Sequence, residues 1–221
     1  MASSSRSRWT WLVVPMAALA VWALARGGAG STSPPVSAPR TASPNASPGL
    51  RPSAAPGKET PYEPADYAGP VRTYAEKAGL NAQLLMAILY NESYKPHDPE
   101  WERAWQSHKP DAAFGIANMH RAAFDETRQG RDFAARKWEE LPDDRPLAVE
   151  AAAWYLHDLE ARLPARWSAP YTRDELLALG YNTGGGNMLA FARGARPGSQ
   201  AQSYLDRLHD NWAKAGDAVQ G

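Results

Sequence analysis

The chain has 221 residues, 43% of them hydrophobic and 22% charged, which excludes collagen, a coiled-coil rod and a wholly disordered chain. Its formal net charge is zero only because two unlike parts cancel. Residues 1–60 hold six basic residues and one acidic residue, which leaves 18 basic and 23 acidic residues in the remainder. A net charge near −5 there argues against nucleic-acid binding, and the lack of cysteine excludes disulfides, cysteine-ligated zinc and a thiol nucleophile.

The first 26 residues predict a signal peptide or a transmembrane anchor. Residues 9–25 form a stretch of 17 residues without a charge, with two arginines before it and one after it. As a helix this stretch would be about 25 Å long, slightly short of the roughly 30 Å hydrocarbon core, so span and signal peptide both stay open. The basic residues orient its N-terminus toward the cytoplasm, and its final Ala-Leu-Ala resembles a signal-peptidase site. Either way, the rest of the chain is expected outside the cytoplasm, anchored in the membrane or secreted to the cell wall.

A low-complexity linker is expected to follow over residues 27–60, where Pro, Ser, Gly, Ala and Thr make up 27 of 34 residues. Such a composition cannot bury enough apolar surface to offset its chain entropy, so we expect a disordered tether. From residue 61 the sequence changes to apolar and charged residues at helical spacing. We therefore expect one domain over residues 61–217, large enough for its own core.

The periodicity of that domain predicts an all-α fold. Asn81 can cap a helix that continues to about residue 93. A second helix is expected after His120, and the longest one from about Pro146. No β-branched run alternates at period two, so strands can be at most minor. The expected buried positions of these helices are Leu84, Leu85, Ile88 and Leu89, then Ala123, Phe124 and Thr127, then Leu147, Ala151, Tyr155, Leu156, Leu159 and Leu163.

Two further helices are expected toward the C-terminus. Thr172 can cap a helix that Gly180 would end as a left-handed residue, and the last helix, over residues 200–215, would be closed by Gly216. The three glycines at 184–186 predict a loop with exposed backbone, which lacks the lysine and the preceding strand of a phosphate-binding loop.

Three segments carry residues that are poorly suited to a purely structural role. Glu92 and Ser93 end an apolar helix, where desolvation would raise the carboxyl pKa and let it donate a proton near neutral pH. Residues 113–119 are small and apolar with one amide, Asn118. Residues 179–187 combine an aromatic residue, an amide and three glycines. A lone glutamate near a helix end is more often solvated, so position alone does not identify a catalyst.

Taken in order, these segments resemble the soluble lytic transglycosylase family of peptidoglycan-cleaving enzymes, which share the lysozyme fold. The resemblance covers roughly residues 80–190. Its elements are the Glu92-Ser93 pair, the turn at residues 115–118, the Tyr155-Leu156 pair and the motif at residues 181–184. It implies a lysozyme-like helical domain that acts on peptidoglycan glycan strands.

The resemblance also implies a role for each matching residue. Glu92 would be the sole catalytic acid and base, Ser93 would help hold the sugar N-acetyl group, and Tyr181 would hydrogen-bond Glu92. Asn182 and Gly115 would shape the cleft. The expected substrate-binding residues are Ser93, Gly115, Ile116, Asn118, Met119, Tyr181 and Asn182.

The implied reaction needs one carboxyl group, whereas most glycosidases use a pair. Glu92 would protonate the β-1,4 glycosidic oxygen between N-acetylmuramic acid and N-acetylglucosamine. As a base it would then deprotonate the 6-hydroxyl, and ring closure would leave a 1,6-anhydro end. No metal or cofactor is expected.

Two alternatives remain open on sequence grounds. Asp98 or Asp111 could supply a second carboxylate for lysozyme-type hydrolysis, or the chain could be a catalytically idle, anchored glycan-binding protein. The five histidines show no metal-ligand spacing and are expected at the surface or the rim of a cleft. Some tryptophans could offer platforms for sugar rings, the candidates being Trp101, Trp105, Trp138, Trp154 and Trp167.

Overall fold

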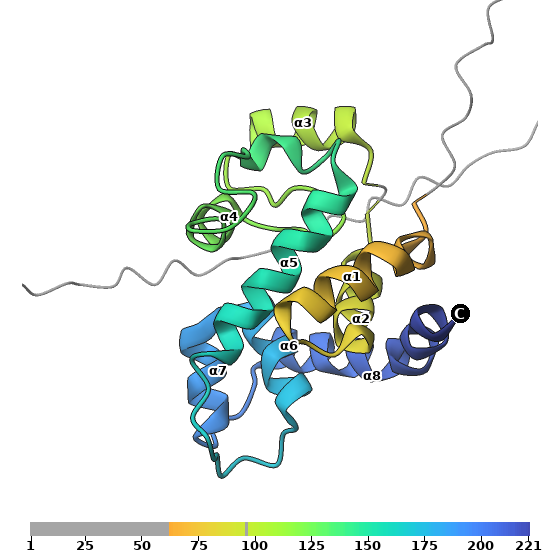
Figure 1. Ribbon diagram of the computed structural model, residues 1–221. Coiled ribbons are helices and arrows are strands. Elements are labelled where there is room, and N and C mark those ends of the chain that lie inside the picture. The colour runs from red at the N-terminus through yellow and green to blue at the C-terminus, as the bar shows by residue number, and fades with distance from the viewer. Residues whose placement is uncertain (1–61, 96) are drawn as a thin grey trace, which may run out of the picture. The chain divides into compact units, whose positions relative to one another are not determined.

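A computed structural model describes residues 62–95 and 97–221, and within these ranges the chain is mainly helical, with 65% of residues in helices and no strand (Figure 1). The expectation of an all-α fold is confirmed at this level. The expected export segment at residues 1–26 and the linker at 27–60 lie outside the described residues. Among the described helices, none combines the length and the apolar character that crossing a membrane requires.

The described part begins with a short 3-10 helix, η1 (Pro64–Tyr67), which leads into α1 (Ala68–Ala78) and then α2 (Ala82–Glu92). Asn81 caps α2 as predicted, because its side-chain oxygen accepts a hydrogen bond from the backbone N–H of Gln83 at 3.0 Å. Every residue from 84 to 92 is buried. The predicted apolar stripe is therefore only part of a helix that is buried on all sides along nine of its eleven residues.

The next segment contains a helix that the periodicity did not predict, α3 (Pro99–His108), where the side chain of Asp98 accepts from the backbone N–H of Trp101 at 2.7 Å. It is followed by α4 (Arg121–Thr127), the 3-10 helix η2 (Trp138–Glu140) and α5 (Arg145–Glu160). The starts of α4 and α5 agree with the predictions after His120 and near Pro146. The expectation that α5 is the longest helix is wrong, since the last helix has 22 residues and α5 has 16.

The C-terminal part consists of α6 (Arg173–Thr183), α7 (Gly185–Ala192) and α8 (Ser199–Gln220). Thr172 caps α6 as predicted, but Gly180 does not end it. The helix continues to Thr183, and Gly184, with φ of 87°, makes the break. The expected glycine loop is also wrong in part, since α7 begins at Gly185.

Two of these glycines serve close packing rather than helix termination. A Cβ at Gly180 would lie 2.8 Å from the sulfur of Met188, so the missing side chain lets α6 and α7 approach each other. Gly216 lies inside α8, where a Cβ would come 2.8 Å from the side-chain nitrogen of Gln83. The predicted end of the last helix at Gly216 is therefore wrong.

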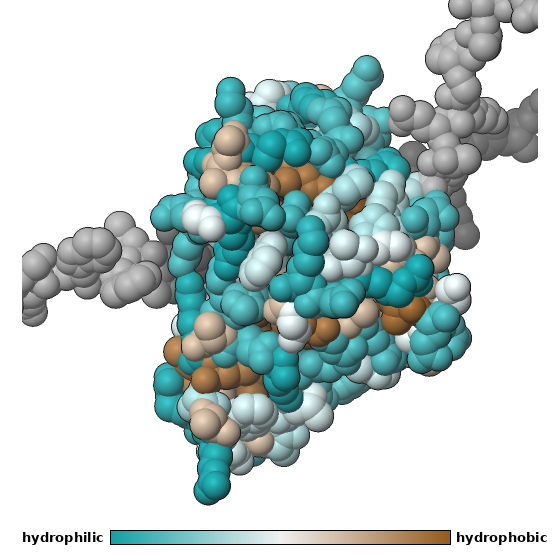
Figure 2. Space-filling view, in the orientation of Figure 1, coloured by the Kyte–Doolittle hydropathy of each residue, from teal (hydrophilic) through white to brown (hydrophobic). Residues whose placement is uncertain are grey.

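The helices pack around one core, with α2 against α8, α1 against α5 and α6 against α7 as the principal pairs. In Figure 1, α5 runs through the middle of this unit, with α3 and α4 toward one end and α6 and α7 toward the other. The face shown in Figure 2 is mostly hydrophilic, with hydrophobic residues visible in small areas between. This arrangement encloses α2 and brings its C-terminal end, Glu92, close to residues from α8.

Candidate active site

Glu92 is the last residue of α2, and its position follows from the burial of that helix. The side chain is only 7% exposed and follows Leu89 and Ile88, which are fully buried. A carboxyl group in such surroundings needs specific partners for both of its oxygens, because a buried polar group without a hydrogen bond is costly.

Two residues from distant parts of the chain provide those partners. The hydroxyl of Tyr204 donates to Oε1 of Glu92 at 2.9 Å, and Nδ2 of Asn118 donates to Oε2 at 2.9 Å. Nδ2 of Asn118 also donates to the main-chain carbonyl oxygen of Glu92 at 3.0 Å. We call Glu92, Asn118 and Tyr204 the carboxyl cluster.

Burial raises the pKa of Glu92 above its ordinary value. The hydrogen bonds from Asn118 and Tyr204, and the charges of His97 and Arg207, act in the opposite direction because they stabilise the ionised form. Burial and the nearby carboxylate of Glu92 also hold the pKa of Tyr204 well above its usual value. The tyrosine hydroxyl therefore keeps its proton and can donate it in a hydrogen bond to Glu92.

The hydrogen-bonding groups indicate where that proton resides. The amide nitrogen of Asn118 can only donate, so Oε2 of Glu92 remains an acceptor in both protonation states. The hydroxyl oxygen of Tyr204 can also accept, so a proton on Oε1 of Glu92 has a partner as well. The cluster can thus hold Glu92 as an acid or as a base without rearrangement of Asn118.

A tight turn places Asn118. Phe114 and Met119 form an isolated bridge, with backbone hydrogen bonds of 3.1 and 3.0 Å in the two directions. Between them, Gly115 has φ of 70° and Asn118 has φ of 47°, a left-handed conformation that asparagine tolerates better than most residues. A Cβ at Gly115 would lie 2.8 Å from the carbonyl oxygen of Leu141, so glycine is required there for space as well.

Contacts between α2 and α8 place Tyr204. The side-chain nitrogen of Asn91 donates to the main-chain carbonyl of Tyr204 at 3.0 Å, and Asn211 donates to the side-chain oxygen of Asn91 at 2.9 Å. Asn91 directly precedes Glu92 in the sequence. The hydrogen bonds of Asn91 with α8 therefore lie next to the hydrogen bond between Tyr204 and the carboxyl group of Glu92.

The structure corrects the expected partner of Tyr181. Its hydroxyl donates to the main-chain carbonyl oxygen of Ala117 at 2.7 Å, and the tyrosine that hydrogen-bonds Glu92 is Tyr204. Tyr181 still borders the site, since the charge of Glu92 contributes, after burial, to raising its pKa well above the usual value. Asn182 is exposed on the last turn of α6.

The remaining expected substrate-binding residues are mainly structural in their observed contacts. The hydroxyl of Ser93 donates to the carbonyl oxygen of Tyr90 at 2.8 Å, so it caps its own helix. Ile116 and Met119 are buried in the core, and the carbonyl oxygen of Met119 accepts from the indole nitrogen of Trp138 at 2.7 Å. These residues support the turn that carries Asn118.

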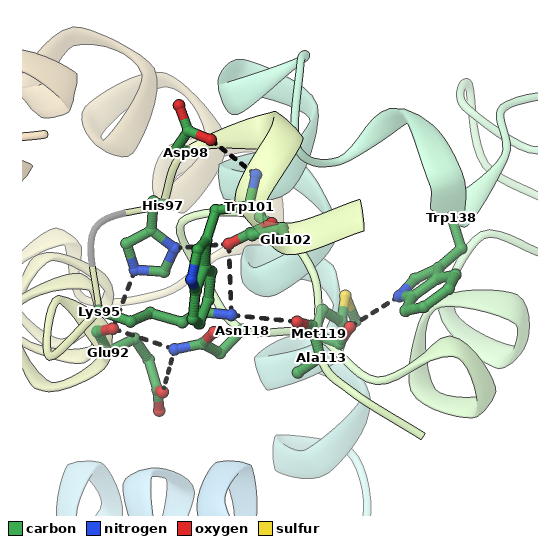
Figure 3. Close-up of polar contacts among 11 residues, drawn as sticks. Glu92, Lys95, His97, Asp98, Trp101, Glu102, Ala113, Asn118, Met119 and Trp138 are labelled. Carbon is green, nitrogen blue, oxygen red and sulfur yellow. Dashed lines mark hydrogen bonds and ion pairs between the residues drawn. The ribbon is translucent and has the colours of Figure 1, made fainter. Parts of the chain in front are cut away.

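One histidine departs from the expectation of surface or rim positions. His97 is 2% exposed, and its ring lies between the main chain of Glu92 and the side chain of Glu102, as Figure 3 shows. Glu102 is equally buried and also contacts Lys95. We call Lys95, His97 and Glu102 the histidine bridge. It lies within the part of the sequence that was interpreted as a spacer.

The two aspartates considered as second carboxylates have other positions. Asp98 caps α3 through its contact with the backbone of Trp101, and Asp111 is an exposed residue of the loop after α3. Within residues 62–95 and 97–221, no group of three or more histidine, aspartate or glutamate side chains is arranged to hold a metal ion.

The sequence did not indicate Tyr204, Glu102 or His97 as site residues. A signal for Tyr204 existed, because it shares the inner face of α8 with Leu205 and Leu208. A hydroxyl on an otherwise apolar face needs a partner across the interface.

Neither the known protein-family models nor the curated protein sequences include a match to this chain.

Proposed function

We propose that the chain is a peptidoglycan lytic transglycosylase with a lysozyme-like helical domain, in which Glu92 acts first as the general acid and then as the general base. The observation that carries the proposal is the carboxyl cluster. Glu92 is buried, its pKa is raised, and each of its oxygens has one donor. This combination suits a group that must be protonated near neutral pH and must also be stable as an anion.

The proposed first step is cleavage of the β-1,4 bond between N-acetylmuramic acid and N-acetylglucosamine. Glu92 transfers its proton to the glycosidic oxygen while the bond from that oxygen to C1 of the muramic acid breaks. The N-acetyl carbonyl oxygen of the substrate supports the cationic centre at C1, which substitutes for the second carboxylate of ordinary retaining enzymes. N-acetylglucosamine leaves with a new hydroxyl group.

The proposed second step forms the 1,6-anhydro ring. The carboxylate of Glu92 takes the proton of the muramic acid 6-hydroxyl, whose oxygen then bonds to C1. Glu92 thus regains a proton from the 6-hydroxyl in place of the one that left with N-acetylglucosamine, and no water is consumed. During the interval the anion is stabilised by the donors of Asn118 and Tyr204.

The contacts of the other carboxylates support this one-carboxyl reaction over hydrolysis. Asp98 is engaged in capping α3. Glu102 is buried and accepts from the backbone N–H of Gly115 at 2.8 Å, with Lys95 at 3.2 Å. A carboxylate that serves as an acceptor for fixed donors is poorly suited to activate a water molecule across a cleft.

Two exposed tryptophans of α3 suit a glycan strand as the substrate. Trp101 is 42% exposed and Trp105 is 48% exposed, and their rings are stacked at 3° with centroids 5.9 Å apart. Large exposed aromatic surfaces of this kind favour contact with the apolar faces of sugar rings. We propose that the two tryptophans extend the binding surface beyond the two sugars at Glu92. We also propose that the domain acts outside the cytoplasm, with the N-terminal segment as its export signal or membrane anchor.

The test is digestion of purified peptidoglycan by the full-length chain, with mass spectrometry of the products. The proposal predicts 1,6-anhydro ends, which contain one water fewer than hydrolytic products. Reaction in ¹⁸O-water sharpens the result, because only hydrolysis introduces the label at a new reducing end. Labelled reducing ends would favour a lysozyme-type hydrolase, and an intact polymer that retains the protein would favour a glycan-binding role.

The control for the site is a pair of isosteric substitutions. Glu92→Gln removes the transferable proton, and Glu76→Gln makes the same change at an exposed position of α1. Only the first substitution is expected to slow product formation, by about 10²-fold or more. Equal activity in both variants would exclude Glu92 as the acid.

A further inference from the structure

The histidine bridge lies beside the carboxyl cluster, and the proposed proton transfers do not use it. Nε2 of His97 is 3.0 Å from the main-chain carbonyl oxygen of Glu92, and Nδ1 is 3.0 Å from Oε1 of Glu102. Oε2 of Glu102 accepts from the backbone N–H of Gly115 at 2.8 Å. Figure 3 shows the ring between these two partners. The bridge therefore connects the end of α2 with the turn that carries Asn118.

The backbone of His97 supports the view that its side chain is needed at this place. Its φ is 50°, and among the described non-glycine residues only Asn118 shares a positive φ. Left-handed backbone costs free energy in residues other than glycine and persists where surrounding contacts compensate for it. Here the compensating contacts are the two hydrogen bonds in which the buried ring takes part.

The contacts of Glu102 with Lys95 and Gly115 favour the ionised form of its carboxyl group. The ammonium group of Lys95 lies 3.2 Å from Oε1, and the backbone N–H of Gly115 points to Oε2. Although burial opposes it, the hydrogen bond from His97, the charge of Lys95 and the backbone of Gly115 together lower the pKa of Glu102. The ammonium group of Lys95 and the backbone N–H of Gly115 can only donate to the carboxylate.

Both partners of the His97 ring are consequently acceptors. The carbonyl oxygen of Glu92 has no proton to give, and neither has the ionised carboxylate of Glu102. Neutral imidazole carries one N–H and could satisfy only one of them, whereas imidazolium carries two. The charged groups around the ring are Glu92 on α2, Glu102 on α3 and Lys95 before α3. Tyr62 packs edge-on against it at 5.0 Å.

We propose that His97, as an imidazolium ion, is a positioning residue for Glu92, because it fixes the end of α2 to the Asn118 turn through Glu102. Its two N–H groups set the distance between the main chain of Glu92 and the carboxylate that holds Gly115. The kinetic consequence rests on the proposed function, whereas the protonation state of the ring does not.

The first test is direct observation of the His97 ring by ¹⁵N nuclear magnetic resonance on the full-length chain at pH 7, with the signal assigned by its absence in His97→Asn. Two protonated ring nitrogens are expected. A ring with a single N–H would overturn the proposal whether or not the chain cleaves glycan.

The second test measures how positioning affects turnover. His97→Asn retains a residue that tolerates positive φ, and Glu102→Gln keeps the shape of the side chain. Matched controls on the exposed face of α3 are His108→Asn and Glu100→Gln. We expect both bridge variants to lower kcat about tenfold with KM nearly unchanged, because small displacements of an acid cost rate more than binding.

The outcomes separate the two proposals. Wild-type kcat in both folded bridge variants would overturn the positioning role of His97. If the wild-type chain forms no anhydro products, the proposed function fails, and the resonance experiment still decides the state of the bridge. Should His97→Asn not fold, the His97 signal is assigned by its shift in Glu102→Gln, whose side chain contacts the ring, and the kcat of Glu102→Gln then tests the positioning role.

Discussion

The α8 side and the α6 side of the candidate site meet Glu92 in different ways. On α8, Tyr204 is buried and donates directly to the carboxyl group of Glu92. On α6, Tyr181 donates to the main chain of Ala117, and Asn182 is exposed. The α8 side can therefore alter the protonation of Glu92 directly, whereas the α6 side acts on it through the turn at residues 114–119.

The largest expected difference is between a substitution of the proposed acid, Glu92, and a substitution of a residue on α6. Glu92→Gln is expected to lower kcat by about 10²- to 10⁴-fold, the usual contribution of a general acid. Asn182→Ala should cost about tenfold or less, since its side chain is exposed. The rate of muropeptide release measures kcat for both variants. Equal losses of kcat would contradict the different roles assigned to Glu92 and to the α6 side.

The same Glu92 substitution should increase stability at higher pH. Burial raises the folded-state pKa of Glu92 above that of the unfolded chain, so the folded state favours the protonated form. That stability is lost as the pH rises through the folded-state pKa, and glutamine has no such loss. The Tm of Glu92→Gln should therefore exceed that of the wild type at alkaline pH, and the difference should narrow toward acid pH.

The pH profile of cleavage should report the raised pKa of Glu92. Only the protonated carboxyl can donate in the first step, so kcat/KM should fall about tenfold per pH unit above that pKa. Because the pKa is raised, this fall should begin at a higher pH than for an ordinary carboxyl group. A decline that begins near pH 4.5 would contradict the effect of burial.

The two tyrosines offer a more direct comparison of the two sides. Tyr204→Phe removes a donor that lowers the pKa of Glu92, so the alkaline limit should move upward and kcat should fall about tenfold. Tyr181→Phe removes a hydrogen bond to the main chain and should lower kcat about twofold, with a loss of about 1 kcal/mol in stability. A larger shift of the pH profile in Tyr181→Phe would reverse the roles assigned to α8 and α6.

The smallest effect is expected at the exposed tryptophans of α3. Trp101→Ala and Trp105→Ala should raise KM for long glycan strands about threefold, because each removes a stacking surface of roughly one sugar ring. Cleavage of a short oligosaccharide should be unaffected. If short and long substrates respond alike, the tryptophans do not form an extended binding surface.

The fold was predictable where a helix start depends on local chemistry. Asn81 and Thr172 cap their helices as their side chains suggest, since the contact is made within three residues. Helix ends at glycine were not predictable. Gly180 and Gly216 allow close packing within helices, and nothing in the local sequence distinguishes that use from a left-handed helix end.

The site was predictable only in part for a related reason. Glu92 and Asn118 belong to local patterns, an apolar helix end and a small-residue turn, and the structure brings them together. Tyr204 lies 112 residues from Glu92, and their contact depends on how α8 packs against α2. His97 and Glu102 were missed because α3 was not expected, so the segment offered no geometry in which the two side chains would meet.

The long-range contact of Tyr204 with Glu92 also has a thermal consequence. Helices open locally before a domain melts as a whole, and α8 supplies one of the two donors to the carboxyl group. Once α8 frays away from α2, water reaches Glu92, which then becomes an ordinary ionised glutamate. On heating, activity should therefore be lost at a lower temperature than the overall helical content. The difference between these two midpoint temperatures reports the stability of the packing of α8 against α2.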